Sequence, residues 1–202
     1  MDISTEEKIL EAARELFAEK GYSGVRMREI AAKAGINKGL LHYYFRNKEA
    51  LFISIFKESF AKFSRKLNEI MASEQNLPEK IDTIVEEYMS LLIANPNLPG
   101  FIVSELHTNT LEFVGEIMSL PDRPDPSLLV MQLHLEAQMG RIRPNDPFHT
   151  VLHILSMCAF PFIAKPIFQR IARLDDEAYL QLMQQRKAAI KHFIRNALIP
   201  VQ

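Results

Sequence analysis

Residues 25–51, VRMREIAAKAGINKGLLHYYFRNKEAL, decide the fold of the N-terminal part of this chain. The apolar residues in the first half of this stretch repeat at helical spacing and predict a short helix over residues 28–34. Gly35 follows where a helix commonly closes with a left-handed residue, and Asn37 can cap a second helix over residues 38–45. Two short helices joined by a three-residue turn predict a helix-turn-helix.

The second helix of this motif has two chemically different faces. Leu41 and Phe45 lie four residues apart and are expected to point into the fold. The other faces carry groups that donate hydrogen bonds or bear positive charge, namely Lys38, His42, Tyr43 and Tyr44. A helix with this distribution of side chains fits the major groove of DNA.

Positive charge is concentrated around the motif. Residues 21–48 hold six basic side chains against Glu29 alone, which gives this segment a net charge of +5. The whole chain has a net charge of -1 at pH 7, so the remaining residues together carry -6. A local basic segment in an otherwise acidic chain is typical of a module that releases counterions from DNA phosphates. The alternative is that the basic residues only form a solvent-exposed helix surface and bind no nucleic acid.

The segment from Thr5 to Ile55 resembles the DNA-binding domain of the TetR family of bacterial transcriptional repressors. The matching residues are Phe17, Gly21, Tyr22, Ile30, Ala31, Gly35, Lys38, Gly39, Leu41, Tyr43, Phe45, Lys48, Glu49 and Leu51. The sequence departs from the family pattern at Arg26, where a capping threonine is usual, and at His42, where a tyrosine is usual. We therefore expect the first helix of the motif to lack its normal cap.

The resemblance implies which residues contact DNA. It assigns phosphate contacts to Lys38, His42, Tyr43, Tyr44 and Lys48. It places Asn37, Lys38 and Gly39 nearest to the base edges, and Arg28 could read a guanine through a bidentate contact. The substitution by His42 is expected to make one phosphate contact dependent on pH.

Length and composition predict the rest of the architecture. A chain of 202 residues with 48% hydrophobic content can hold a small domain and a second domain of ordinary size. Long helical periodicities and the lack of alternating strand patterns predict an all-α protein with about nine helices. We expect a three-helix DNA-binding domain over residues 1–47 and a larger helical domain for ligand binding and dimerisation over residues 48–202. A long helix capped by Asn47 is expected to connect them.

The single cysteine and the lack of a leader pattern favour a reducing cytoplasm, and the resemblance implies a bacterial protein that joins the nucleoid when bound to DNA. Cys158 has no partner for an internal disulfide, and we interpret it as a small buried apolar group rather than a redox sensor. The N-terminus is charged and has no apolar core segment. The longest mostly apolar run, residues 151–164, falls short of the ~18 residues of a membrane span, so no membrane partner is predicted.

The last helix, expected from Asp175 onward, carries a broad apolar stripe that needs cover. In proteins that this segment resembles, the last two helices of each subunit form a four-helix bundle about a two-fold axis. The resemblance therefore implies a homodimer, with candidate seam residues Leu182, Met183, Ile190, Phe193 and Ile194. Recognition of a palindromic operator by two short helices also favours a dimer. The alternative is that the stripe is internal core.

The second domain has enough adaptable apolar surface to line a cavity for a small lipophilic effector. The candidate lining residues are Tyr88, Met89, Phe101, Phe113, Met131, His134 and Phe160. Each of them could instead be plain core. The resemblance implies that the ligand moves the long fourth helix and changes the separation of the two recognition helices.

Two classes of function other than a ligand-responsive DNA-binding regulator also fit parts of the sequence. His149 and His153 lie four residues apart, with Asp146 and His134 as further possible ligands, a spacing that fits a zinc sensor or a metal-dependent enzyme. The chain has no HExxH motif and no second clustered pair, so we predict no metal site and no cofactor. No nucleophile, base and orienting group stand at a catalytic spacing, so we predict no enzyme. A constitutive regulator without an organic ligand is the remaining alternative.

Overall fold

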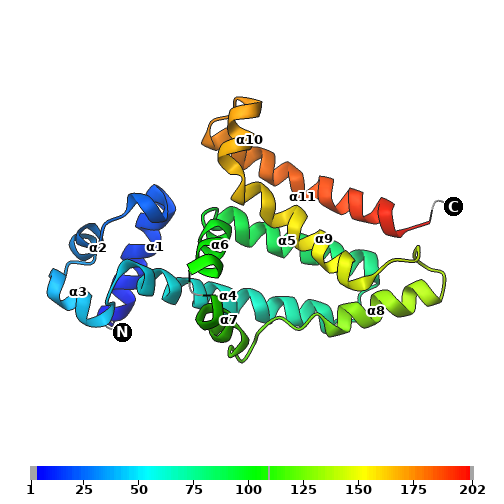
Figure 1. Ribbon diagram of the computed structural model, residues 1–202, viewed down its shortest axis with the longest axis horizontal. Coiled ribbons are helices and arrows are strands. Elements are labelled where there is room, and N and C mark those ends of the chain that lie inside the picture. The colour runs from blue at the N-terminus through cyan, green and yellow to red at the C-terminus, as the bar shows by residue number, and fades with distance from the viewer. Residues whose placement is uncertain (1–3, 109, 201–202) are drawn as a thin grey trace. The chain divides into compact units, whose positions relative to one another are not determined.

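The computed structural model describes residues 4–108 and 110–200, and within them the chain is helical without any strand, as predicted (Figure 1). The helices are α1 (Thr5–Gly24), α2 (Met27–Lys33), α3 (Lys38–Tyr44), α4 (Lys48–Ala72), α5 (Leu77–Ala94), α6 (Leu98–Thr108), α7 (Thr110–Met118), α8 (Ser127–Gln138), α9 (Pro147–Ile163), α10 (Lys165–Ala172) and α11 (Asp176–Leu198). These described residues hold eleven helices, close to the nine expected. The excess arises because residues 98–118 form two helices and residues 147–172 form two more.

The chain divides into two compact units, Met1–Ala61 and Lys62–Gln202. The boundary therefore lies inside α4, later than the expected division after residue 47. The physical reason is the packing of the first half of α4 in the N-terminal unit. The ring of Phe52 meets the rings of Phe17 and Tyr22 edge-on, at centroid distances of 5.2 Å and 5.0 Å.

The first unit forms around α1. Ser4 and Glu7 make the predicted capping box, in which the Glu7 amide donates to Ser4 Oγ at 3.2 Å and the Ser4 amide donates to the Glu7 carboxylate at 2.9 Å. The helical backbone of α1 is interrupted by a kink at Gly21, whose φ of 70° is accessible to glycine at little cost. The buried side chains of this small core come from α1 to α4 and include Ile9, Ala13, Phe17, Ile30, Leu41, Phe45 and Leu51.

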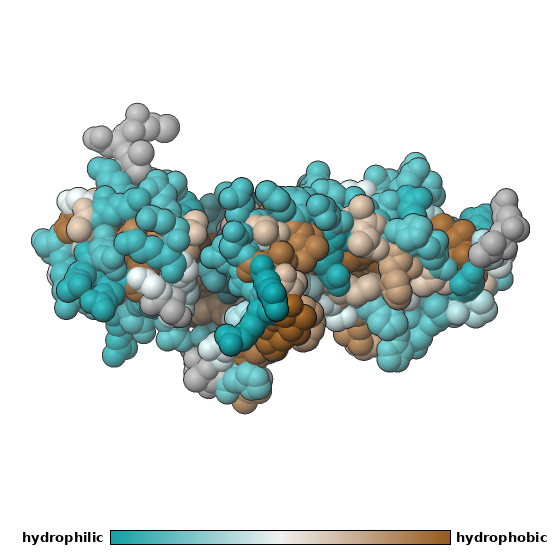
Figure 2. Space-filling model, turned by 90° about the horizontal axis from the view of Figure 1, so that it is seen from above, coloured by the Kyte–Doolittle hydropathy of each residue, from teal (hydrophilic) through white to brown (hydrophobic). Residues whose placement is uncertain are grey.

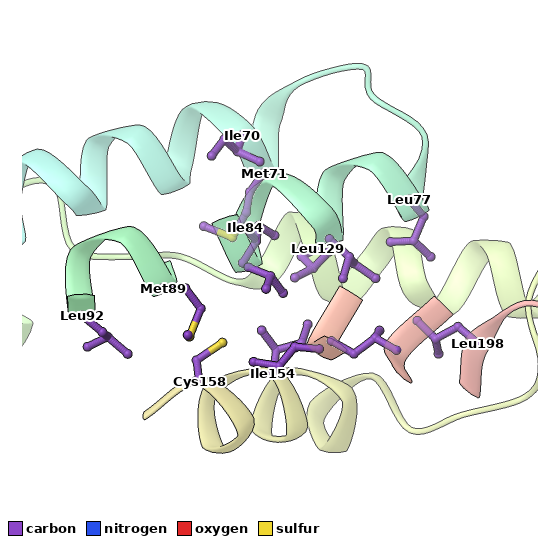
Figure 3. Close-up of a cluster of buried hydrophobic side chains, with 14 of the residues drawn as sticks. Ile70, Met71, Leu77, Ile84, Met89, Leu92, Leu129, Ile154, Cys158 and Leu198 are labelled. Atoms are coloured by element: carbon purple, nitrogen blue, oxygen red, sulfur yellow. The ribbon is translucent and has the colours of Figure 1, made fainter. Parts of the chain in front are cut away.

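Helix α5 is central to the second unit and packs against both α9 and α11 (Figure 1). The core between them also receives side chains from α4 and α8, such as Ile70 and Leu129 (Figure 3). In this core the sulfur atoms of Met89 on α5 and Cys158 on α9 point toward each other (Figure 3). Burial of these apolar side chains is the main favourable contribution to the packing of the helices.

Ion pairs supplement this packing along the contact of α5 with α11. The Glu86 carboxylate accepts hydrogen bonds from Lys187 at 2.8 Å and Lys191 at 2.6 Å, and these two bonds hold its pKa below the ordinary value. Arg195 pairs with Asp82 at 2.6 Å, one helical turn earlier in α5. The three pairs fix the register of the two helices more than they add to stability, because each is partly exposed to solvent.

The chain bends sharply between α9 and α10. Proline has no backbone N–H to donate and commonly kinks or ends a helix, and Pro161 and Pro166 flank this bend. The helix continues through Pro161 as far as Ile163, and α10 then leaves at 69°. The break deprives the Pro161 carbonyl of its helical donor, and the Tyr179 hydroxyl donates to this carbonyl at 2.7 Å. Among the described residues no single helix meets the length and hydropathy of a membrane span, although the bent pair α9 and α10 does so jointly.

A buried lysine closes the C-terminal end of α4. The Lys80 side chain is 3% exposed, and its ammonium donates to the Met71 carbonyl at 2.9 Å and to the Ser73 carbonyl at 2.8 Å. These carbonyls lie at the end of the helix and lack intrahelical donors. Burial lowers the pKa of Lys80, whereas the two charge-assisted hydrogen bonds stabilise its ammonium form at the end of α4.

We expect Lys80→Met to destabilise the protein by about 1–3 kcal/mol, because two buried carbonyls lose their donor. Urea unfolding followed by circular dichroism measures the change. Lys66→Met is the matched control, since Lys66 lies on α4 with an exposed side chain. Equal stability of the Lys80→Met and Lys66→Met variants would contradict the capping role.

Candidate nucleic-acid interface

Helices α2 and α3 form the predicted helix-turn-helix. Gly35 follows α2 with a φ of 68°, and the Ile36 amide donates to the Ala31 carbonyl at 3.0 Å to close the turn. The Asn37 side chain accepts the Leu40 amide at 2.8 Å and so caps α3 as predicted. Leu41 is fully buried and anchors α3 on the small core, which leaves the opposite side of the helix in solvent.

The start of α2 confirms that its side-chain cap is missing. Arg26 occupies the cap position, and its guanidinium has no acceptor atom to offer the helix. Glu29 partly compensates, because its carboxylate accepts the Arg26 amide at 2.8 Å. Lys20 also donates to Glu29 at 3.0 Å, and this hydrogen bond holds the pKa of Glu29 below its ordinary value.

The exposed side of α3 presents the predicted polar and cationic groups together. We call Lys38, His42, Tyr43 and Tyr44 the α3 face. All four are exposed, and Tyr43 is exposed over 82% of its surface with its ring perpendicular to that of Tyr44. A tyrosine this exposed gains little from the fold of its own subunit, so it is available for an external surface.

The charges near the α3 face differ in whether they are neutralised within the subunit. Lys33 pairs with Glu15 on α1 at 2.5 Å. Arg28, Lys38 and Arg46 are exposed and form no ion pair with any residue that the structure describes. These three cations therefore retain the positive potential that attracts phosphate groups.

Gly39 lies beside the side chain that caps α3. A Cβ atom at this position would lie 3.2 Å from the Asn37 side-chain oxygen that caps α3. The glycine thus leaves room for the capping carboxamide. Its proximity to base edges remains an expectation from the resemblance.

The Lys48 side chain makes contacts within its own subunit. Its ammonium donates to the carbonyls of Tyr22 at 2.8 Å and Val25 at 3.1 Å, and it lies 4.3 Å from the centroid of the Tyr22 ring. These partners hold the end of α1 against the start of α4. Lys48 therefore joins these two helices within the subunit, and its expected phosphate contact stays a prediction.

His42 has one ring nitrogen engaged by the backbone. Nδ1 lies 3.1 Å from the Arg46 carbonyl, which can only accept, so Nδ1 carries the proton in this contact. In that tautomer the other ring nitrogen, Nε2, is an acceptor and does not donate to a phosphate. The pH dependence of a phosphate contact by His42 stays a prediction.

The seven residues expected to line an effector cavity do not form one group. Met89 belongs to the central core, and the ring of Tyr88 stacks on that of Phe63 at 5.5 Å. Phe101 and Phe113 are buried and face each other edge-on at 6.4 Å. The remaining three, Met131, His134 and Phe160, are exposed on α8 and α9.

Three of the five expected seam residues belong to the core of the subunit. Met183, Ile190 and Ile194 are only 3%, 2% and 4% exposed and pack against α5 and α9, so the seam assignment is corrected for them. Leu182 and Phe193 are 41% and 63% exposed. They lie three helical turns apart on one side of α11, where a second surface could cover them.

Sequence reasoning missed the exposed apolar stripe on α9. Phe148, Leu152 and Leu155 follow one another at spacings of four and three residues, and all three are exposed. The stripe next to it on the helix, with Ile154 and Cys158, is buried in the core. An apolar character on both sides of the helix was the available signal, because such a helix requires cover on two faces.

The histidines of α9 do not complete a metal site. The rings of His149 and His153 lie 6.3 Å apart between centroids, as their spacing predicts. Among the described residues no group of three metal-ligating side chains comes together. The Asp146 side chain instead caps α9 by accepting the His149 amide at 2.9 Å.

Cys158 is a buried apolar group, as expected. Its side chain is fully buried, and burial raises the pKa of its thiol to about 12. A thiol that remains protonated and out of solvent is a poor nucleophile. This environment does not suit a redox sensor.

Comparison with known proteins gives the same assignment for the N-terminal segment. The family model of bacterial regulatory proteins, tetR family, matches residues 9–55. The HTH-type transcriptional repressor AcnR of Corynebacterium efficiens is 31% identical over 157 residues, which cover 75% of this chain and 76% of that protein. The fatty acid metabolism regulator protein of Bacillus subtilis is 34% identical over 110 residues, but these span 54% of this chain and only 57% of that protein.

A solved structure extends the similarity to most of the chain. It is the crystal structure of the transcriptional regulator FadR from Bacillus subtilis in complex with stearoyl-CoA. It covers 91% of this chain and 96% of its own, with a TM-score of 0.59 and 24% sequence identity. At this identity the likeness concerns the fold alone.

Proposed function

This chain belongs to the tetR family of bacterial regulatory proteins and is a DNA-binding transcriptional regulator, and on that premise we propose that it is a dimeric repressor of a palindromic operator, released by a lipophilic effector. The observation that carries this proposal is the α3 face. It combines an exposed tyrosine pair with the unpaired cation Lys38 on a helix held by a buried leucine, and the unpaired cation Arg28 lies on the preceding helix α2. Short exposed helices of this chemistry suit contact with both phosphates and base edges.

Arg28 is assigned to direct reading of a base. Its side chain is exposed and forms no ion pair with any described residue, so its guanidinium is available for a bidentate contact with guanine. The α3 face and Asn37 would supply the neighbouring contacts. Lys48 supports them from within the subunit.

We expect Arg28→Ala to weaken binding to the preferred operator by about 1–3 kcal/mol and to relax preference at one base position. Fluorescence anisotropy with the operator and with single-base variants measures both effects. Lys33→Ala is the matched control, because Lys33 is already paired with Glu15. An unchanged sequence preference in Arg28→Ala would transfer base reading to Asn37 or Lys38.

Dimerisation is assigned to the exposed sides of α9 and α11. Leu152 and Leu155 on α9 and Leu182 and Phe193 on α11 leave apolar surface in water. A second copy that covers both stripes would form a four-helix bundle around a two-fold axis. The symmetry of such a dimer matches that of a palindrome.

The effector is assigned to the second unit. A protein of the same fold was crystallised with stearoyl-CoA, which supports a long acyl chain as the first ligand class to test. Buried aromatic groups such as Phe101 and Phe113 provide apolar surface of the required kind. Helix α4 belongs to both units, so a ligand that moves it would act on the DNA-binding unit through a continuous helix.

We expect stearoyl-CoA to raise the melting temperature of the protein and to lower its affinity for the operator. To convert the protein from mostly bound to mostly free of the operator, the ligand must bind the released state about 10⁴-fold more tightly than the DNA-bound state. Thermal shift and anisotropy competition measure the two effects, with coenzyme A alone as the control. An unchanged melting temperature and an unchanged DNA affinity would favour the constitutive form.

A further inference from the structure

A hollow of about 380 Å³ lies between α10 and α11, beside the end of α9. Its walls are mainly apolar and include Phe160, Phe168, Ile171, Leu182 and Ala189. The surface near the middle of Figure 2, where α10 faces the viewer, shows the apolar character of this part of the unit. The size lies within the range of sites that hold small ligands.

The hollow lies beside a helix, α10, whose position relative to α11 is fixed by several bonds. No residue of α10 is buried, although it carries Ile167, Phe168 and Ile171. Arg173 adopts a φ of 56° and turns the chain back, and the Leu174 amide closes the turn on the Gln169 carbonyl at 3.0 Å.

The start of α11 holds the other side of this helix. Asp176 pairs with Lys165 at 2.7 Å and accepts a hydrogen bond from Gln169 at 3.0 Å, and these bonds hold its pKa below the ordinary value. Two residues of α10 are thus tied to one residue of α11. The geometry keeps the two helices joined at one end and leaves space between them further along.

Arg186 places a positive charge in the wall of this apolar hollow. Its Nε donates to the Met157 carbonyl at 3.1 Å, which fixes the side chain against α9. Its Nη atoms form no hydrogen bond or ion pair with the residues that the structure describes. No acidic residue is among those that line the hollow. The guanidinium therefore offers a fork of donors that fits a carboxylate.

We propose that the hollow binds a small amphipathic carboxylate, with its hydrocarbon part against Phe160, Phe168 and Ile171 and its carboxylate on the Nη atoms of Arg186. A neutral apolar molecule would leave these donors without an acceptor. A second copy of the chain would do the same if it covered the hollow with apolar side chains, because an unpaired cation is costly to bury. An anion with an apolar body satisfies both parts of the site.

The test uses the full-length protein without DNA, so its outcome is independent of the proposed operator recognition. Isothermal titration compares octanoate with 1-octanol, which has the same chain without the charge. We expect Arg186→Met to weaken octanoate binding about tenfold and to leave 1-octanol binding unchanged, because the variant loses only a charge-assisted contact. Arg186→Lys is expected to restore part of the affinity.

Two further variants locate the binding. Ala189→Phe should abolish binding of both molecules by filling the hollow, whereas Arg170→Met should change neither, because Arg170 is an exposed cation of α10 outside the lining. Circular dichroism confirms the folding of each variant. Absence of octanoate binding, or an octanoate affinity that is equal in the unchanged protein, Arg186→Met and Ala189→Phe, would overturn the proposal.

Discussion

Replacing Leu152 and Phe193 together by aspartate is expected to convert the protein into a monomer and to lower its affinity for a palindromic operator by about 10³-fold or more. Both side chains are exposed in the subunit, so the replacement leaves the subunit core intact. In a dimer they would place four carboxylates within an apolar seam, and the cost of burying them prevents association. Sedimentation equilibrium measures the mass, and anisotropy measures the operator affinity.

A control pair distinguishes this effect from general damage. Leu111 and Met118 are exposed on α7, away from the proposed seam helices. Leu111→Asp with Met118→Asp should therefore leave both the mass and the DNA affinity unchanged. A dimer that survives the replacements at Leu152 and Phe193 would assign the two-fold contact to another surface.

The second large effect is expected from the α3 face. The double variant Lys38→Ala and Tyr43→Ala removes one cation and one aromatic ring from each subunit, and thus two of each from a dimer. We expect operator affinity to fall by about 10²–10³-fold and the slope of its logarithm against that of salt concentration to lessen by about two units. Anisotropy titrations at several salt concentrations give both quantities.

This variant should retain the melting temperature of the unchanged protein, because both side chains are exposed. Lys66→Ala removes an exposed cation from α4 and should alter neither affinity nor slope. If the α3 double variant bound the operator with unchanged affinity and salt dependence, another surface would have to carry the DNA contact.

The helix-turn-helix could be predicted from sequence because its interactions are local. Asn37 caps α3 through an amide three residues later, and Gly35 supplies a left-handed residue directly after α2. Such contacts depend on residue type and spacing alone. The same applies to the absent cap at Arg26.

The role of Lys48 could not be predicted in this way. Its ammonium binds the carbonyls of Tyr22 and Val25, which precede it by 26 and 23 residues. Every residue has a backbone carbonyl, so residue type does not show which carbonyls Lys48 will contact. The contact can be identified only from the three-dimensional arrangement of the helices. The pattern of the family suggested a phosphate contact at the same position.

The seam assignment on α11 failed in part for a related reason. Helical periodicity predicted one broad apolar stripe, but the structure divides it between two faces. Met183 and Ile190 face the core, whereas Leu182 and Phe193 face solvent. Periodicity identifies which residues are apolar, and only the packing of α5 and α9 decides which of them remain exposed.

The proposed effector residues show the same limit. Sequence composition indicated adaptable apolar side chains, and Phe101 and Phe113 do meet in the interior. Met131 and Phe160 are instead exposed on separate helices. Residue type alone does not bring side chains from different helices to one cavity.

Selection of bound duplexes from a pool of random DNA tests the proposed recognition of a palindrome by two copies of α3. We expect the enriched sequences to share two inverted half-sites at a fixed separation, and we expect Lys38→Ala with Tyr43→Ala to remove the enrichment. A pool that remains random after repeated selection at low salt would contradict operator recognition by this protein.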